Sequence, residues 1–270
     1  MGLGAPEGRG QMRALVVATW ALALATTCDV ARAQTTAALN DAIILYSKGQ
    51  YGAAVRALQP IAEQGTAVAQ LILGKALLVK YIPSHDCETA KYWLTKASEG
   101  GNSEAAFLLA DVFRSDECAK PEKWVAVRWY LKADSLGHAD AANMIGEIYL
   151  SEGPDPADAF EARLWFLRGV RNYDWHAAAN LGYMYLHGIG ALRDEQEAYK
   201  WYAVAYAQMP IFATERNDVL AARDVARESL MPNQVRKASN AADGVIDAAI
   251  GGFKEPKASG ELSSLNFAVE

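Results

Sequence analysis

A tryptophan recurs every 36 residues through the middle of this chain, with no insertion or deletion in the series: Trp93, Trp129, Trp165 and Trp201. Four other columns keep the same interval with small or apolar residues: Gly74, Ala110, Gly146 and Gly182; Leu73, Leu109, Ile145 and Leu181; Ala90, Ala126, Ala162 and Ala198; and Leu94, Tyr130, Phe166 and Tyr202. A period of about 20 to 50 residues is typical of stacked supersecondary units. The chain is therefore predicted to fold as a solenoid.

Each repeat is predicted to be a pair of α-helices. Leu73 and Leu77 are four residues apart, as are Ala90 and Leu94, which is the spacing of an apolar helix face. A glycine such as Gly101 follows the second helix, where a helix C-terminus favours a positive φ. The glycine column lets two helices approach closely, and the tryptophan column is expected to supply buried core area.

The last repeat resembles a known family. The stretch AANLGYMYLHGIGALRDEQEAYKWYAVAYA is similar to a Sel-one-like repeat, the 36-residue branch of the tetratricopeptide superfamily. The resemblance rests on these positions: Leu181, Gly182, Tyr185, Gly188, Gly190, Asp194, Ala198, Trp201, Tyr202 and Ala205. It implies an all-α fold, a right-handed α/α solenoid of stacked two-helix repeats. It also implies a role as an adaptor or regulator in the bacterial cell envelope, as family members of this type have.

The ends of the chain predict export. Arg9 and Arg13 precede the uncharged run 14–25, and the small residues Ala31 and Ala33 favour a cut before Gln34, so residues 1–33 are predicted to be a signal peptide. The apolar run is far shorter than the roughly 18 residues of a membrane-spanning helix, which makes a retained anchor the weaker interpretation. Lipidation at Cys28 is also weaker, because the three residues before it, Ala25 to Thr27, lack the leucine that is usual in lipidation signals. We expect a periplasmic protein of a Gram-negative bacterium.

The rest of the chain divides into four predicted segments. A degenerate first repeat covers residues 34–65, and four Sel-one-like repeats cover 66–209. Capping helices are predicted over 210–252, because a solenoid must cover the exposed edge of its last repeat. The remaining residues, 253–270, have few apolar side chains and are predicted to be disordered.

Charge and motifs exclude several functions. The formal net charge is −6 and no run of lysines and arginines occurs, which argues against a nucleic acid partner. The chain has four histidines and none of the common hydrolase, zinc or phosphate-loop motifs, so neither catalytic residues nor a cofactor is predicted. His176 and His187 would lie about 16 Å apart along one helix, too far to share a metal ion.

Two cysteines follow the predicted signal peptide, Cys87 and Cys118. The second helix of one repeat and the first helix of the next form an antiparallel hairpin that turns near Gly101. The two cysteines are equally far from that turn, so they are predicted to lie opposite each other and to form a disulfide after export. The alternative is two separate free thiols.

A binding surface is predicted from the positions that vary between repeats. In tetratricopeptide-like arrays the first helix of each unit lines a concave groove, and residues seven apart share a helix face. The predicted groove residues are Lys75, Glu104, Asp111, Asp140, Asn143, Glu147, His176, Asn180 and Tyr183. Their carboxylates suggest an acidic groove for a basic, extended peptide. An ordinary solvated helix face is the alternative.

These observations favour an exported scaffold or adaptor that binds a partner protein or peptide and is not an enzyme. The process that the resemblance implies is envelope regulation or assembly. A peptidoglycan-binding or cell-wall-modifying protein is the alternative. The side chains of the groove carboxylates are long enough for two of them to come within the distance that a glycosidase needs. Incubation with purified cell wall separates binding from release of fragments.

Overall fold

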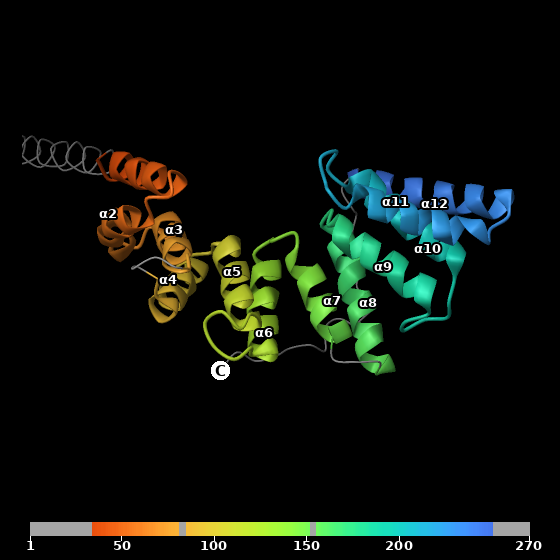
Figure 1. Cartoon of the computed structure of the whole chain (residues 1–270), viewed down its shortest axis with the longest axis horizontal. Helices are drawn as coiled ribbons and strands as arrows, with labels where there is room; N and C mark the ends of the chain where they lie inside the picture. The colour runs from red at the N-terminus through yellow and green to blue at the C-terminus, as the bar shows by residue number, and fades with distance from the viewer. Residues whose placement is uncertain (1–33, 81–84, 152–154, 251–270) are drawn as a thin grey trace, which may run out of the picture. The chain divides into compact units, whose positions relative to one another are not determined.

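Every regular element in the described part of the chain, residues 34–80, 85–151 and 155–250 of a computed structural model, is an α-helix (Figure 1). A first helix occupies residues 34–47. The others are α2 (Tyr51–Glu63), α3 (Ala67–Leu77), α4 (Cys87–Glu99), α5 (Ser103–Arg114), α6 (Lys123–Ser135), α7 (Ala141–Ser151), α8 (Pro156–Arg171), α9 (Trp175–His187), α10 (Glu195–Gln208), α11 (Arg216–Glu228) and α12 (Pro232–Ile250). The predicted signal peptide and the predicted tail lie outside the described residues.

The chain forms two compact units, which divide after Val112. In the first unit, α3 packs against both α2 and α4. Leu58 of α2 and Leu73 of α3 are buried in one apolar cluster, to which the helix over 34–47 adds Ala42. The degenerate first repeat predicted from the sequence thus corresponds to two helices, and burial of their apolar faces holds them against α3.

In the second unit, α8 to α12 share one apolar core, which includes Phe166, Leu181 and Met184. The last two helices, α11 and α12, both pack against α10 (Figure 1). Val219 and Ala226 of α11 and Ala242 of α12 are buried in that core. These helices lie where the sequence predicted a cap, and their apolar residues cover the outer side of the last repeat.

Close helix approach explains the glycine column. A Cβ atom added to Gly74 would lie 2.7 Å from Cγ of Leu94, and one added to Gly182 would lie 2.9 Å from Cγ of Tyr202. Both contacts are shorter than side chains tolerate, so the column must be glycine wherever the facing residue sits this close. The two columns that the sequence aligned therefore face each other within a repeat.

The tryptophan column is less buried than the sequence predicts. Only Trp201 is buried, at 7% exposure, whereas Trp93, Trp129 and Trp165 are partly exposed. The next column supplies the core instead, since its members are buried in all four repeats. One residue is about 100° around a helix, so the indoles lie at the edge of the apolar face, where Lys200 stands 4.3 Å from the ring centre of Trp201.

The turns after α2, α4, α6 and α8 each contain a left-handed residue. Gly65, Gly101 and Gly137 stand 36 residues apart with φ of 86°, 85° and 85°. The next residue of this column is Tyr173, with φ of 64°. A tyrosine in this region is strained, because its Cβ approaches the following carbonyl oxygen.

Candidate functional site

The most connected set of predicted residues lies on α7 and α9, the first helices of two consecutive repeats. Buried residues such as Ile145 and Leu181 fix the inner side of each helix in the core. The helical period then places the predicted groove residues on one shared side of the two helices, where all but the buried Asn143 are exposed or partly exposed, and we call this set the α7–α9 face. It consists of Asp140, Asn143, Glu147, His176, Asn180 and Tyr183.

Hydrogen bonds join three members of the α7–α9 face across the two helices. Nδ2 of Asn180 donates to Oδ1 of Asn143 over 2.9 Å. Nδ2 of Asn143 in turn donates to Oε1 of Glu147 over 3.0 Å. Asn143 is only 3% exposed, so both of its polar groups need these partners. The result is a carboxylate held in one orientation by a buried amide.

His176 is tied to the cap of its own helix. Asp174, the N-cap residue of α9, is buried, and its Oδ1 accepts both the backbone N–H of His176 at 2.9 Å and a contact from Nδ1 of the ring at 3.0 Å. This hydrogen bond is the main reason that the pKa of His176 is raised, and the charges of Asp174, Asp140 and Glu147 act in the same direction. The imidazole therefore stands in the field of carboxylates from both helices.

Aromatic side chains complete the C-terminal half of α9. Tyr183 is 49% exposed, and its ring meets that of His187 edge to face, with centroids 4.2 Å apart. Beneath it, burial raises the pKa of Tyr202 to about 12, and the nearby Tyr183 contributes in the same direction. The Tyr183 ring is thus held beside His187, and about half of its surface is exposed.

The remaining predicted residues lie in the first unit. Nζ of Lys75 on α3 forms an ion pair with Oε1 of Glu104 on α5, 2.8 Å away. Asp111 is partly buried in α5. The four carboxylates of the predicted groove therefore belong to two different units, and one of them already has a cation beside it.

Two residues near the α7–α9 face were missed from the sequence. Asp174 anchors His176, and a signal was present: an Asp two residues before His at a helix start is a capping arrangement. Glu215 precedes α11, and its pKa is lowered first by a backbone hydrogen bond, then by a hydrogen bond with the Thr214 side chain and last by the charge of His176. No local sequence signal connects Glu215 to α9, because only the packing of the last helices brings it there.

Four consecutive segments of the chain, residues 67–102, 103–138, 139–174 and 175–208, match the Sel1 repeat, and together they cover more than half of it. The chain belongs to the Sel1 repeat family. The all-α, right-handed α/α solenoid that the resemblance predicted is confirmed. Sel1 repeat proteins generally mediate protein–protein interactions, and the repeat scaffold is generally non-enzymatic.

A solved structure shows the same fold. The crystal structure of a Sel1 repeat protein from Oxalobacter formigenes matches with a TM-score of 0.58 at 21% identity, over 78% of this chain and 87% of that one. A protective antigen of uropathogenic Escherichia coli with a Sel1-like repeat fold, c5321, matches at 21% identity with a TM-score of 0.39, over 80% of this chain and 52% of that one. No curated protein gives a significant match.

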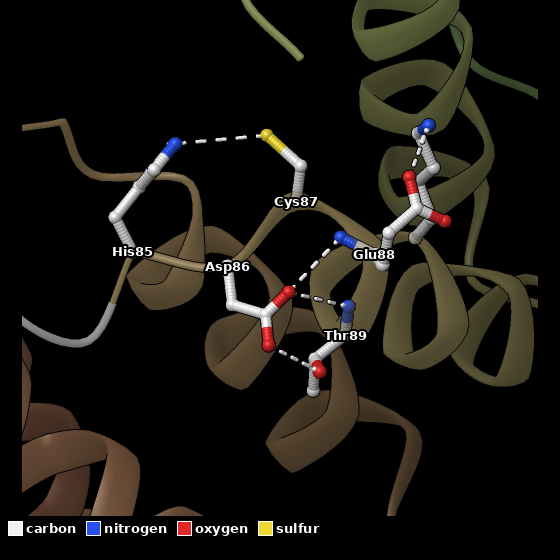
Figure 2. Close-up of polar contacts among 6 residues, drawn as sticks. His85, Asp86, Cys87, Glu88 and Thr89 are labelled. Carbon is white, nitrogen blue, oxygen red and sulfur yellow. Dashed lines mark hydrogen bonds and ion pairs between the residues drawn. The ribbon is translucent and has the colours of Figure 1, made fainter. Parts of the chain in front are cut away.

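A second polar cluster of this Sel1 repeat protein lies at the N-terminus of α4 (Figure 2). Asp86 caps the helix, and its Oδ1 accepts the backbone N–H groups of Glu88 and Thr89, each at 3.1 Å. Cys87 follows the cap, and Nε2 of His85 lies 3.6 Å from its Sγ. Both Cys87 and Cys118 are disulfide-bonded. A disulfide sulfur carries no proton, so the imidazole nitrogen is the donor in this contact.

The described residues of this Sel1 repeat protein include neither a metal-binding cluster nor a membrane-spanning helix. No group of three or more histidine, cysteine, aspartate or glutamate side chains is placed to hold a metal ion. None of the helices described combines the length and apolar character needed to cross a bilayer.

Proposed function

We propose that this Sel1 repeat protein is an exported adaptor, and that the α7–α9 face binds a basic, extended segment of a partner protein. The observation that carries the proposal is the hydrogen-bonded series from Asn180 through buried Asn143 to Glu147. A carboxylate that is already oriented loses less side-chain entropy on binding than a mobile one. Glu147 is therefore suited to accept a charge-assisted hydrogen bond from lysine or arginine.

The chemistry of the neighbouring side chains supports the same partner. Asp140 adds a second carboxylate, and its charge acts on His176 together with that of Glu147. Tyr183 offers an exposed aromatic ring, which can contact an apolar or cationic side chain. The partly exposed Asn180 donates its Nδ2 to Asn143, which leaves its Oδ1 to accept a backbone N–H of an extended peptide. An acidic face that also presents an amide oxygen favours a basic peptide over an anion.

Binding of synthetic peptides tests this proposal. Fluorescence anisotropy with extended nine-residue peptides of basic, neutral and acidic composition is expected to rank the basic peptide first. Glu147→Gln keeps an oxygen for Asn143 but removes the charge, and with Asp140→Asn it is expected to weaken the basic peptide by about fivefold or more. Asn143→Leu tests the orientation step, with far-UV circular dichroism as the check on folding.

Asp243→Asn is the matched control, because it removes a charge from an exposed residue of α12, away from this face. The proposal fails if this control weakens binding as much as the α7–α9 variants do. It also fails if the neutral peptide binds as well as the basic one. Loss of binding together with loss of helical signal in Asn143→Leu would count as unfolding, and the two charge variants then decide.

Export to the envelope is the second part of the proposal. It rests on the arginines before the uncharged run at residues 14–25 and on the cleavage pattern before Gln34. Fractionation of Gram-negative cells that express the whole chain is expected to recover protein beginning at Gln34 in the periplasmic extract. Recovery of the uncleaved chain in the cytosol would contradict export and would leave the binding proposal untouched.

A further inference from the structure

An aromatic pair on α6 and α7 lies outside the α7–α9 face. Trp124 stands in the first turn of α6, and Tyr149 near the end of α7; their ring centroids are 5.6 Å apart and their planes are inclined at 68°. Trp124 is 53% exposed, which is unusual for so large an apolar side chain. Burial, followed by the charges of Glu161 and Asp158, raises the pKa of the Tyr149 phenol.

One of these two carboxylates, Asp158, has no capping role because of the way α8 begins. In the other repeats, the residue equivalent to Asp158 lies just before the second helix. Its backbone N–H donates to the carbonyl of the residue equivalent to Tyr149. In the last repeat, for example, the N–H of Asp194 donates to the carbonyl of Tyr185 over 2.9 Å. α8 instead starts at Pro156, and Asp155 takes over as its cap. Asp158 is thereby freed from capping while its position beside α7 is retained.

The equivalent positions 36 residues later, on α8 and α10, show what this arrangement looks like when cations are present. Thirty-six residues later in the chain, Phe160 has the guanidinium of Arg163 over its ring at 5.2 Å, and Glu197 is paired with Lys200. The equivalents of these two cations beside Trp124 and Glu161 are the apolar residues Val127 and Leu164. Within the described residues, Asp158 and Glu161 have no hydrogen-bond or ion-pair partner. The set around Trp124 keeps the aromatic and acidic groups but has apolar residues at these two cation positions, and Arg163 of α8 lies over Phe160 instead.

We propose that Trp124, Tyr149, Asp158 and Glu161 form a binding site for an organic cation, and that its ligand is an arginine side chain of a protein partner. Guanidinium stacks on aromatic rings and also donates hydrogen bonds to carboxylates. A quaternary ammonium group has no N–H to offer the two acids. This site shares no residue with the α7–α9 face, so each can fail without the other.

The test uses a single amino-acid probe on the whole protein. Nα-acetyl-arginine amide is titrated against protein labelled with ¹⁵N at the tryptophan indoles, with the Trp124 signal identified by Trp124→Phe. We expect a saturable shift of that signal with a Kd on the order of 10 mM, as suits one exposed cation contact. The neutral isostere Nα-acetyl-citrulline amide is expected to bind at least about fivefold more weakly.

Two variants test the role of the carboxylates, and a second tryptophan signal in the same protein serves as a reference. The double change Asp158→Asn with Glu161→Gln is expected to weaken arginine by about fivefold, and Leu164→Lys should weaken it too by restoring the cation of the last repeat. The Trp201 indole, which already donates to Glu197 under Lys200, is the reference that should not saturate.

Three outcomes would overturn the proposal: a Trp124 signal that shifts no more than that of Trp201, equal binding of citrulline and arginine, or an arginine response that survives the double change. The comparison of arginine with citrulline needs no variant, so it remains decisive if a substitution disturbs folding. Tighter binding of tetramethylammonium than of arginine would also overturn it, because the carboxylates would then have no role as acceptors.

Discussion

Gly146 on α7 stands directly against the ring of Phe166 on α8, and a Cβ atom placed on this glycine would lie 2.6 Å from Cε1 of the ring. Phe166 is fully buried, so it has no space into which to retreat. We expect Gly146→Ala to lower the free energy of unfolding by about 1–3 kcal/mol through overpacking. Urea denaturation followed by circular dichroism measures this change.

Gly244→Ala is the control for that experiment. Gly244 lies within α12 and has no atom within 4 Å of the position that its Cβ would take. Alanine there should raise stability by about 0.5–1 kcal/mol through helix propensity alone. Stabilisation by both substitutions would show that the contact between Gly146 and Phe166 is looser than described.

The backbone at Tyr173 predicts a stabilising substitution. Its φ of 64° costs an L-residue about 1–2 kcal/mol, which exceeds the entropic cost of about 0.5–1 kcal/mol for glycine. Tyr173→Gly is therefore expected to raise the free energy of unfolding. Gly137→Ala, in the same column with φ of 85°, should do the opposite. Thermal unfolding of the two variants would disprove the strain argument if both lowered the melting temperature.

The pKa of His176 predicts a pH dependence. Because the folded pKa lies above the ordinary value of 6.5, the protonated imidazole contributes stability below pH 6.5 that is lost as pH rises through the folded pKa. Asp174→Asn removes the main cause, so an NMR titration should show the His176 pKa fall. The signal of His187 serves as the reference. An unchanged pKa would mean that the hydrogen bond to Asp174 is not the cause.

The same histidine predicts how binding on the α7–α9 face responds to pH. A protonated His176 competes with a basic peptide for the field of Asp140 and Glu147. Affinity for the basic peptide should therefore rise as pH rises through the His176 pKa. His176→Gln should flatten this dependence, as anisotropy titrations from pH 5.5 to 8.5 would show. A pH profile that is the same in His176→Gln would contradict the link.

Thiol counting tests the disulfide. Oxidised protein that begins at Gln34 is expected to show no free thiol in denaturant, because Cys87 and Cys118 are both disulfide-bonded. Reduction should lower the free energy of unfolding by about 3–4 kcal/mol if the two are paired with each other. Cys87→Ser with Cys118→Ser should match the reduced protein. Two titratable thiols per chain would exclude the bridge.

Much of the fold was predictable from the 36-residue period. Gly182 and Tyr202 belong to two columns, one of small residues and one of large apolar residues, and the structure places them in contact. The spacing of apolar residues alone predicts which face of each helix is buried. The burial of tryptophan was overestimated, because residue size does not report which edge of the apolar face a side chain occupies. The earlier start of α8 does not hide these columns, because the core residues repeat in every unit.

The candidate sites were less predictable, because their geometry depends on contacts between repeats. The sequence aligned Asn143, Glu147 and Asn180 but carried no sign that Asn143 is buried and bonded to both of the others. The sequence also did not predict that Asp158 is available for binding, for a different reason. Its availability follows from the three-residue extension at the start of α8, which a column of equivalent acids conceals.

The packing of α11 and α12 on α10 has a consequence for how chains of this type can lengthen. Those two helices fit the outer side of one particular repeat, so a unit added after Gln208 would meet a surface with a different shape. A block of 36 residues duplicated between residues 103 and 174 would instead leave both ends unchanged. Changes in copy number are thus expected within the array, with the terminal repeat and its covering helices inherited as one piece.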